Sequence, residues 1–182
     1  MTKLVLFVVF SVGIACLSWR FLRLGRTHGF YRFFAFECIL VLILLNADRW
    51  LTNPSSPAQV ASWLLLLSSA AVALQGAHGL VIVGKPARIN RREEEIGIEA
   101  TTTLVTVGAY RYIRHPLYAS LLFLGWGACL KHVTLLAFLL AVMVSAFVTA
   151  TAKVEEVENL RKFGDGYAAY MKKTKMFVPF VV

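Results

Sequence analysis

The sequence is poor in charged residues. Only 16% of its 182 residues are Asp, Glu, Lys or Arg, whereas 58% are hydrophobic, and the mean hydropathy is +0.68. A soluble globular domain has about one quarter charged and about half apolar residues. The composition therefore excludes an ordinary soluble domain.

Cysteine and nucleotide-binding glycine motifs are also scarce. The three cysteines, Cys16, Cys38 and Cys129, lie inside apolar runs. An odd number so placed forms neither a disulfide framework nor a Cys-rich zinc site, and we predict no metal. No strand followed by G-x-G-x-x-G is present, so a nucleotide-like cofactor must be held by helices and loops at a membrane surface.

What the sequence has instead is long apolar runs. A membrane-spanning helix needs about 20 mostly apolar residues. We therefore predict an all-α, polytopic membrane protein with five transmembrane helices over residues 4–21, 33–51, 58–83, 116–130 and 133–154. We expect two regions: three N-terminal helices in 1–84, and in 85–182 a loop, a transmembrane hairpin and a tail that form a catalytic region.

Basic residues are distributed unequally between the two predicted sides. One side carries Lys3, Arg49 and Lys131, whereas the other 16 Lys and Arg residues flank the opposite ends of the spans. The positive-inside rule then places the N-terminus outside and the C-terminus in the cytoplasm. The formal net charge of +9 follows from this bias and favours contact with membrane lipids, not with nucleic acid.

Aromatic, cationic and titratable side chains converge before the fourth predicted span. Tyr110, Arg114 and His115 precede Pro116, and Tyr118 follows one turn later. Pro116 suits the first turn of a helix, where its missing N–H costs nothing. Arg and Tyr are also ordinary interfacial anchors, but the whole cluster favours a site at the cytoplasmic mouth of this span.

A second polar stretch follows the fifth predicted span. This helix is expected to run past the membrane and end at Gly164, before a short helix with Tyr167 and Tyr170. Glu156 shares a face with apolar residues and therefore needs a hydrogen-bonding or cationic partner. Glu155 lies on a polar stripe that could line a wet cavity. The helical spacing alone does not choose between the two glutamates.

Together these residues resemble a known family. Gly108 to Tyr118 contains R-H-P-x-Y, and Glu155-Glu156, Phe163-Gly164, Tyr167 and Tyr170 follow in order. This pattern, over roughly residues 102–179, is similar to the superfamily of isoprenylcysteine carboxyl methyltransferases and phospholipid methyltransferases.

The resemblance implies an integral membrane enzyme that binds S-adenosylmethionine at the cytoplasmic face and methylates a lipophilic acceptor taken from the bilayer. It implies that the cofactor site contains Thr103, Leu104, Val105, Tyr110, His115, Pro116, Tyr118 and Glu155, and we add Glu156 from its helical face. The residues expected near the substrate are Thr151, Lys153 and Arg114. Thr151 stands where prenylcysteine enzymes usually carry an anchoring arginine. Lys153 follows two residues later, but a lysine cannot bind a carboxylate bidentately as an arginine can.

The acceptor stays open at this stage. The leading interpretation is O-methylation of a prenylcysteine-type carboxylate. The alternative is a lipid amine N-methyltransferase, with His115 or Glu156 as the base. A membrane reductase would require NADPH contacts that we do not find, and a non-enzymatic scaffold or lipid-binding protein would use these motifs only as interfacial anchors.

Overall fold

The protein is helical in the computed structural model, which describes residues 1–24, 27–84 and 103–179. No strand occurs in these three ranges, although Ile113 and Lys175 form an isolated parallel bridge. The elements are α1 (Thr2–Leu24), α2 (His28–Leu45), η1 (Ala47–Arg49), α3 (Pro57–Ile82), η2 (Gly108–Arg111), α4 (Pro116–Cys129), α5 (Leu135–Phe163) and α6 (Asp165–Lys173). The prediction of an all-α protein is confirmed for this part of the chain.

Helix-capping residues set several of the helix ends. The side chains of Thr27, Ser56 and Thr134 each accept a hydrogen bond from a first-turn N–H, at the start of α2, α3 and α5 respectively. Pro116 occupies the first turn of α4. Gly164, with a φ of +55°, ends α5, because glycine adopts this left-handed conformation without a steric penalty.

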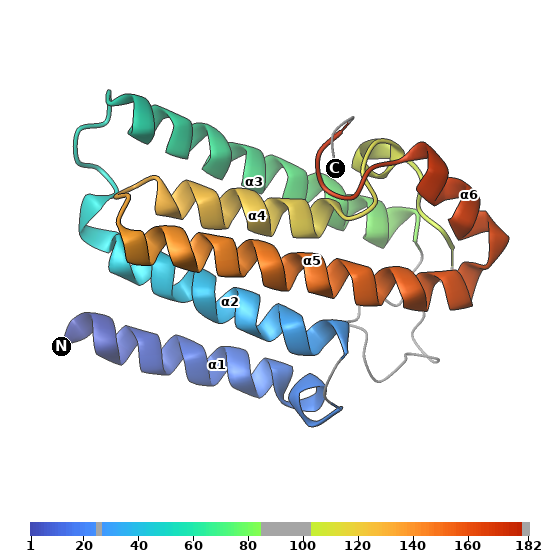
Figure 1. The fold of residues 1–182 in the computed structure, drawn as a ribbon, viewed down its shortest axis with the longest axis horizontal. Helices are drawn as coiled ribbons and strands as arrows, with labels where there is room; N and C mark the ends of the chain where they lie inside the picture. The colour runs from blue at the N-terminus through green and yellow to red at the C-terminus, as the bar shows by residue number, and fades with distance from the viewer. Residues whose placement is uncertain (25–26, 85–102, 180–182) are drawn as a thin grey trace.

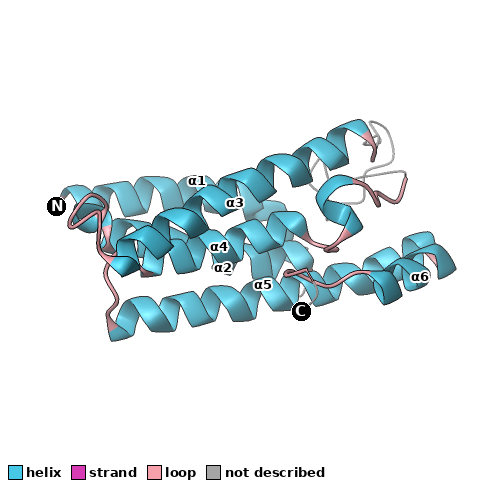
Figure 2. Ribbon diagram, turned by 90° about the horizontal axis from the view of Figure 1, so that it is seen from above, coloured by secondary structure: helices cyan, strands magenta, loops and turns pink. Residues whose placement is uncertain are grey.

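The long helices lie side by side and alternate in direction (Figure 1). α2 packs on α1, α5 and α4, and α4 packs in turn on α3 and α5. Figure 2, seen at right angles to Figure 1, again shows α4 between α3 and α5. The end of α3, the start of α4 and the end of α5 therefore meet at one end of the bundle, together with α6.

Small residues bring α3 and α4 close together. The Ser62 hydroxyl donates to the Gly127 carbonyl at 2.7 Å, and the Ser69 hydroxyl donates to the Ser120 carbonyl at 2.8 Å. A Cβ added to Gly127 would lie 3.0 Å from the Leu66 side chain. Such close backbone approach with interhelical hydrogen bonds is typical of helix pairs in membranes.

Four helices, α1, α2, α3 and α5, are long and apolar enough to span a membrane. The predicted span 33–51 was shifted along the chain, because the helix begins at the Thr27 cap and ends at Leu45. α4 is also shorter than a typical span: its 14 residues extend about 21 Å, against a hydrocarbon core of about 30 Å. Of the five predicted transmembrane helices, four are therefore long and apolar enough to cross a membrane, and the fifth, α4, is a shorter apolar helix.

The short α4 creates a recess at one end of the bundle. α5 continues to Phe163, with 29 residues and a length of about 43 Å, so it extends beyond the start of α4 at Pro116. The pocket at this end is lined by residues from the end of α3, the segment before α4 and the extension of α5. Residues 85–102 lie outside the described residues, so the proposed division between 84 and 85 remains a prediction, as does the membrane orientation.

Candidate active site

The segment before α4 is fixed by the chain that follows α6. The Arg114 N–H donates to the Lys175 carbonyl at 2.8 Å, and the Lys175 N–H donates to the Tyr112 carbonyl at 3.1 Å. The His115 N–H donates to the Met176 carbonyl at 3.2 Å. These bonds hold the backbone of the R-H-P-x-Y element from the side of the C-terminal segment. Helix α4, which begins at Pro116, holds it from the other side.

The two adjacent glutamates have different partners. Glu155 Oε2 accepts a hydrogen bond of 2.5 Å from the Tyr118 hydroxyl. Glu156 Oε1 accepts one of 2.6 Å from Arg114 Nε. Glu156 is 8% exposed, so the structure supplies the cationic partner that its apolar face requires.

Arg114 links three parts of the chain. Besides its bond to Glu156, its Nη1 donates to the main-chain carbonyls of Thr174, at 2.5 Å, and Met171, at 3.4 Å. The guanidinium thereby joins α5 to the end of α6. A guanidinium held by a carboxylate and two carbonyls has little capacity left to grip a ligand carboxylate bidentately.

His115 lies between the two glutamates. Its ring stacks on that of Tyr118, with centroids 5.4 Å apart and an interplanar angle of 22°. Nδ1 lies 4.0 Å from Glu155 Oε1, and Nε2 lies 3.4 Å from Glu156 Oε1. Nε2 is buried and makes no hydrogen bond to any described residue. The imidazole is therefore held between the two carboxylates.

Two tyrosines of α6 complete the polar side. The Tyr170 hydroxyl donates to the Tyr110 carbonyl at 2.6 Å, which ties α6 to η2. Tyr167 is 2% exposed. Burial raises the pKa of its hydroxyl, and the nearby Asn159 side chain lowers it by a smaller amount. Burial raises the pKa of both tyrosines, so both hydroxyls stay protonated at neutral pH.

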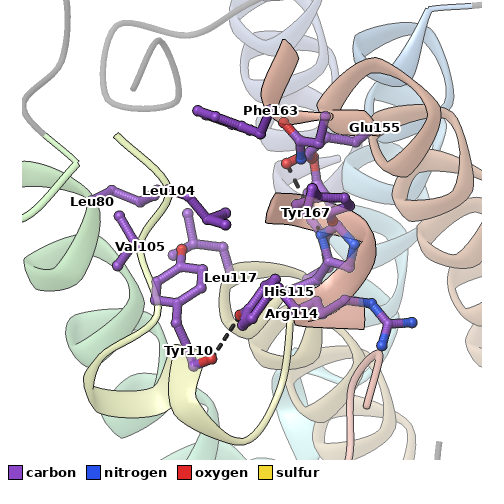
Figure 3. A pocket seen from close by; sticks show the side chains of 13 residues that line it. Leu80, Leu104, Val105, Tyr110, Arg114, His115, Leu117, Glu155, Phe163 and Tyr167 are labelled. Atoms are coloured by element: carbon purple, nitrogen blue, oxygen red, sulfur yellow. Dashed lines mark hydrogen bonds and ion pairs between the residues drawn. The ribbon is translucent and has the colours of Figure 1, made fainter. Parts of the chain in front are cut away.

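These side chains surround an open pocket of about 600 Å³, including space continuous with the solvent. Figure 3 shows aliphatic side chains, among them Leu80, Leu104 and Val105, opposite His115, Glu155 and Tyr167. The lining residues are Leu80, Leu104, Val105, Tyr110, Arg114, His115, Leu117, Tyr118, Glu155, Asn159, Phe163, Tyr167 and Tyr170.

Most of the predicted site residues are brought together here. Those that line the pocket are Leu104, Val105, Tyr110, Arg114, His115, Tyr118 and Glu155. Pro116 and Glu156 are buried beside it, and Thr103 is exposed outside it. The segment 103–105 is irregular.

Two residues expected near the substrate lie elsewhere. Thr151 is 1% exposed, and its hydroxyl donates to the Phe147 carbonyl of its own helix at 2.8 Å. Lys153 is exposed and does not belong to the pocket lining. Neither residue therefore lines this pocket, and their expected place near the substrate stays a prediction.

Sequence reasoning missed part of the lining. Asn159 and Phe163 follow Glu155 at intervals of four residues on α5, and Tyr167 follows on α6. The i, i+4, i+8 spacing from Glu155 places the first two on one helix face and could have identified them. Leu80, at the end of α3, carried no comparable signal.

Comparison with known proteins agrees with this arrangement. The family model for phospholipid methyltransferases matches residues 70–165, more than half of the chain. The match extends from α3 to the start of α6 and so includes the R-H-P-x-Y element and both glutamates. No curated protein matches the chain significantly. The chain therefore belongs to the phospholipid methyltransferase family, within the superfamily of integral membrane methyltransferases that also contains the isoprenylcysteine carboxyl methyltransferases.

Proposed function

We propose that this protein transfers the methyl group of S-adenosylmethionine to the amine of a membrane lipid, in the pocket above α4. Family membership supports methyl transfer to a lipid-related acceptor. The choice of an amine is ours. It rests on one observation about the two charged groups that line the pocket. The Glu155 carboxylate is bound by the Tyr118 hydroxyl and not by a strong cationic partner, whereas the Arg114 guanidinium is bound to Glu156.

The pocket suits the proposed cofactor chemically. S-adenosylmethionine carries a sulfonium, an ammonium, a carboxylate and an aromatic base. Glu155 supplies negative charge, and the imidazole of His115 lines the pocket beside it. Aromatic rings, including those of Tyr110 and Phe163, line the same space and can interact with a cation or a flat base.

In the proposed reaction, the cofactor supplies an activated methyl group for in-line displacement. The residues of this chain then have two tasks: to orient the acceptor and to exclude water, which together can account for roughly 7–11 kcal/mol of the barrier. Tyr118 fixes the Glu155 carboxylate through its 2.5 Å hydrogen bond. Leu80, Leu104 and Val105 provide the apolar wall against which the lipid part of an acceptor can lie.

An ammonium acceptor must lose a proton before it can accept a methyl group. Glu155 is placed to receive this proton, because its carboxylate faces the pocket and lies 4.0 Å from His115 Nδ1. Glu156 is less suited to the role, because Arg114 stabilises its negative charge. This argument favours Glu155 over the two bases expected from the sequence, Glu156 and His115.

The test is methyl transfer from radiolabelled S-adenosylmethionine by the detergent-purified, full-length protein. Two acceptors are compared: vesicles containing an ethanolamine phospholipid, and a farnesylated cysteine with a free carboxylate. We expect a base-stable N-methyl product from the first, lost in Glu155→Gln and retained in Glu158→Gln, a matched variant on the same helix that pairs with His28. A base-labile methyl ester formed only on the farnesylated cysteine would overturn the amine proposal.

The pH profile provides a second readout. The amine acceptor should react faster as pH rises toward the pKa of an alkyl amine, about 10, because the neutral amine is the nucleophile. A carboxylate acceptor is ionised above about pH 6, given a reference pKa near 4, and would give a flat profile. A flat profile with the ethanolamine lipid would contradict deprotonation as part of the reaction.

A further inference from the structure

A second cavity lies between α1 and α2, away from the pocket. It is an open apolar groove of about 1080 Å³, a volume that includes space continuous with the surroundings. α1 packs substantially only against α2 among the described elements, so this groove borders the most peripheral helix. Its lining residues are Ile14, Leu17, Ser18, Phe21, Arg32, Phe36, Ile39, Leu40 and Ile43.

The groove has the length of one bilayer leaflet. On α2 its lining extends from Arg32 to Ile43, eleven residues further along. At 1.5 Å per residue this is about 16 Å, close to half of a hydrocarbon core of about 30 Å. A single acyl chain that enters at Arg32 would therefore lie along most of α2, as far as Ile43 near the end of that helix.

Positive charge is concentrated at one end of this groove. Arg32 is 4% exposed, and its guanidinium lies 5.5 Å from the centre of the Phe21 ring. Arg20 and Arg23 are exposed on the last turns of α1, at the same end of the bundle. A buried arginine near the end of a membrane helix is a candidate functional position. Arginine is also the side chain best suited to phosphate.

We infer that the α1–α2 groove is a binding site for one anionic phospholipid, with an acyl chain along the apolar lining and the phosphate at Arg32. The apolar groove selects a chain, and the basic end selects a negatively charged headgroup. The bound chain would fill the space between α1 and α2 and thereby fasten α1 to the bundle. This inference is independent of the proposed methyl transfer, because the site is separate from the pocket.

The experiment is native mass spectrometry of the full-length protein after release from nanodiscs that contain equal amounts of phosphatidylglycerol and phosphatidylcholine with identical chains. We expect one retained lipid, with phosphatidylglycerol favoured at least about fivefold, the ratio that corresponds to ~1 kcal/mol for one basic residue. Arg32→Gln should abolish this preference. Arg49→Gln, which changes an arginine at the opposite end of the bundle, should preserve it.

A second pair of variants tests the chain site without changing charge. Ser18→Phe places a large side chain in the groove, whereas Val9→Phe adds the same side chain at an exposed position of α1 outside it. We expect Ser18→Phe to lose the retained lipid and Val9→Phe to keep it. Equal retention of both lipids by the wild type, retention unaffected by Arg32→Gln and Ser18→Phe, or a lipid-free dimer would each overturn the inference.

Discussion

The two ends of the helix bundle both bury charged side chains, but they use them differently. At the end opposite the pocket, Lys131 is 4% exposed. Its ammonium lies 3.6 Å from the centre of the Trp63 ring and donates to Gln59 Oε1 at 3.1 Å. Gln59 Nε2 in turn donates to the carbonyls of Arg49 and Lys131, both at 3.1 Å. This charge is enclosed by partners from its own chain.

At the pocket end, the buried polar groups are only partly satisfied. The side chain of Glu155 is 25% exposed and takes a hydrogen bond from Tyr118, while Nε2 of His115 makes none to described residues. Burial alone therefore does not identify a functional group. What distinguishes the pocket end is a partly exposed carboxylate, Glu155, beside the pocket, whereas the ammonium of Lys131 is held by Gln59 and Trp63.

Arg114 provides the strongest test of this comparison, because it lies at the pocket end but is enclosed like Lys131. Arg114→Met would leave the Glu156 charge buried without its cation. We expect a loss of about 3–5 kcal/mol in the free energy of unfolding, measured by denaturant titration in mild detergent. The double variant Arg114→Met/Glu156→Met removes both charges and should regain most of this loss. No loss in the single variant would mean that this ion pair does not support the fold.

Glu155→Gln should affect ligand binding more than stability. Truncating one partner of a buried charge pair costs at least about 2 kcal/mol, so we expect the Kd for S-adenosylmethionine to rise about 30-fold or more, as measured by calorimetry. The melting temperature should stay close to that of the wild type, because Tyr118 can still donate to the amide oxygen. Wild-type affinity in this variant would exclude Glu155 from the cofactor site.

Lys131→Met should have the opposite pattern. Methionine fills similar space beside Trp63 and Trp50 but leaves Gln59 Oε1 without its donor, so we expect a stability loss of about 1–2 kcal/mol and unchanged cofactor affinity. Burial lowers the pKa of Lys131 from 10.5. Between this lowered pKa and 10.5 the unfolded state binds more protons, so the wild type should gain stability relative to Lys131→Met as pH rises. If the stability difference between wild type and Lys131→Met fell as pH rose over this range, it would contradict a lowered pKa of Lys131.

Ser62→Ala should have the smallest effect. It removes the 2.7 Å hydrogen bond to the Gly127 carbonyl between α3 and α4. Interhelical hydrogen bonds of this kind contribute about 0.6 kcal/mol on average, and we expect a loss of that order with normal methyl transfer. A loss above about 2 kcal/mol would show that the contact between α3 and α4 depends on this bond more than on close packing.

Local sequence signals predicted the parts of the fold that depend on neighbouring residues. Pro116 indicated the start of α4, Gly164 the end of α5, and the tyrosine spacing a short helix afterwards, as the structure has them. The start of α2 was misplaced, because Thr27 caps that helix before the apolar run begins. The length of apolar runs indicates membrane segments well but locates helix ends poorly, since a helix can extend through polar flanks.

The sequence by itself determined that the chain is helical and suited to a membrane, and that aromatic, basic and acidic residues gather around the start of α4. It left open which glutamate faces the pocket, because helical spacing gives the face of a residue but not what packs on that face. The tertiary structure decided this by placing Arg114 against Glu156 and Tyr118 against Glu155. Both contacts join residues about forty positions apart, and they form because the short α4 begins beside the extension of α5.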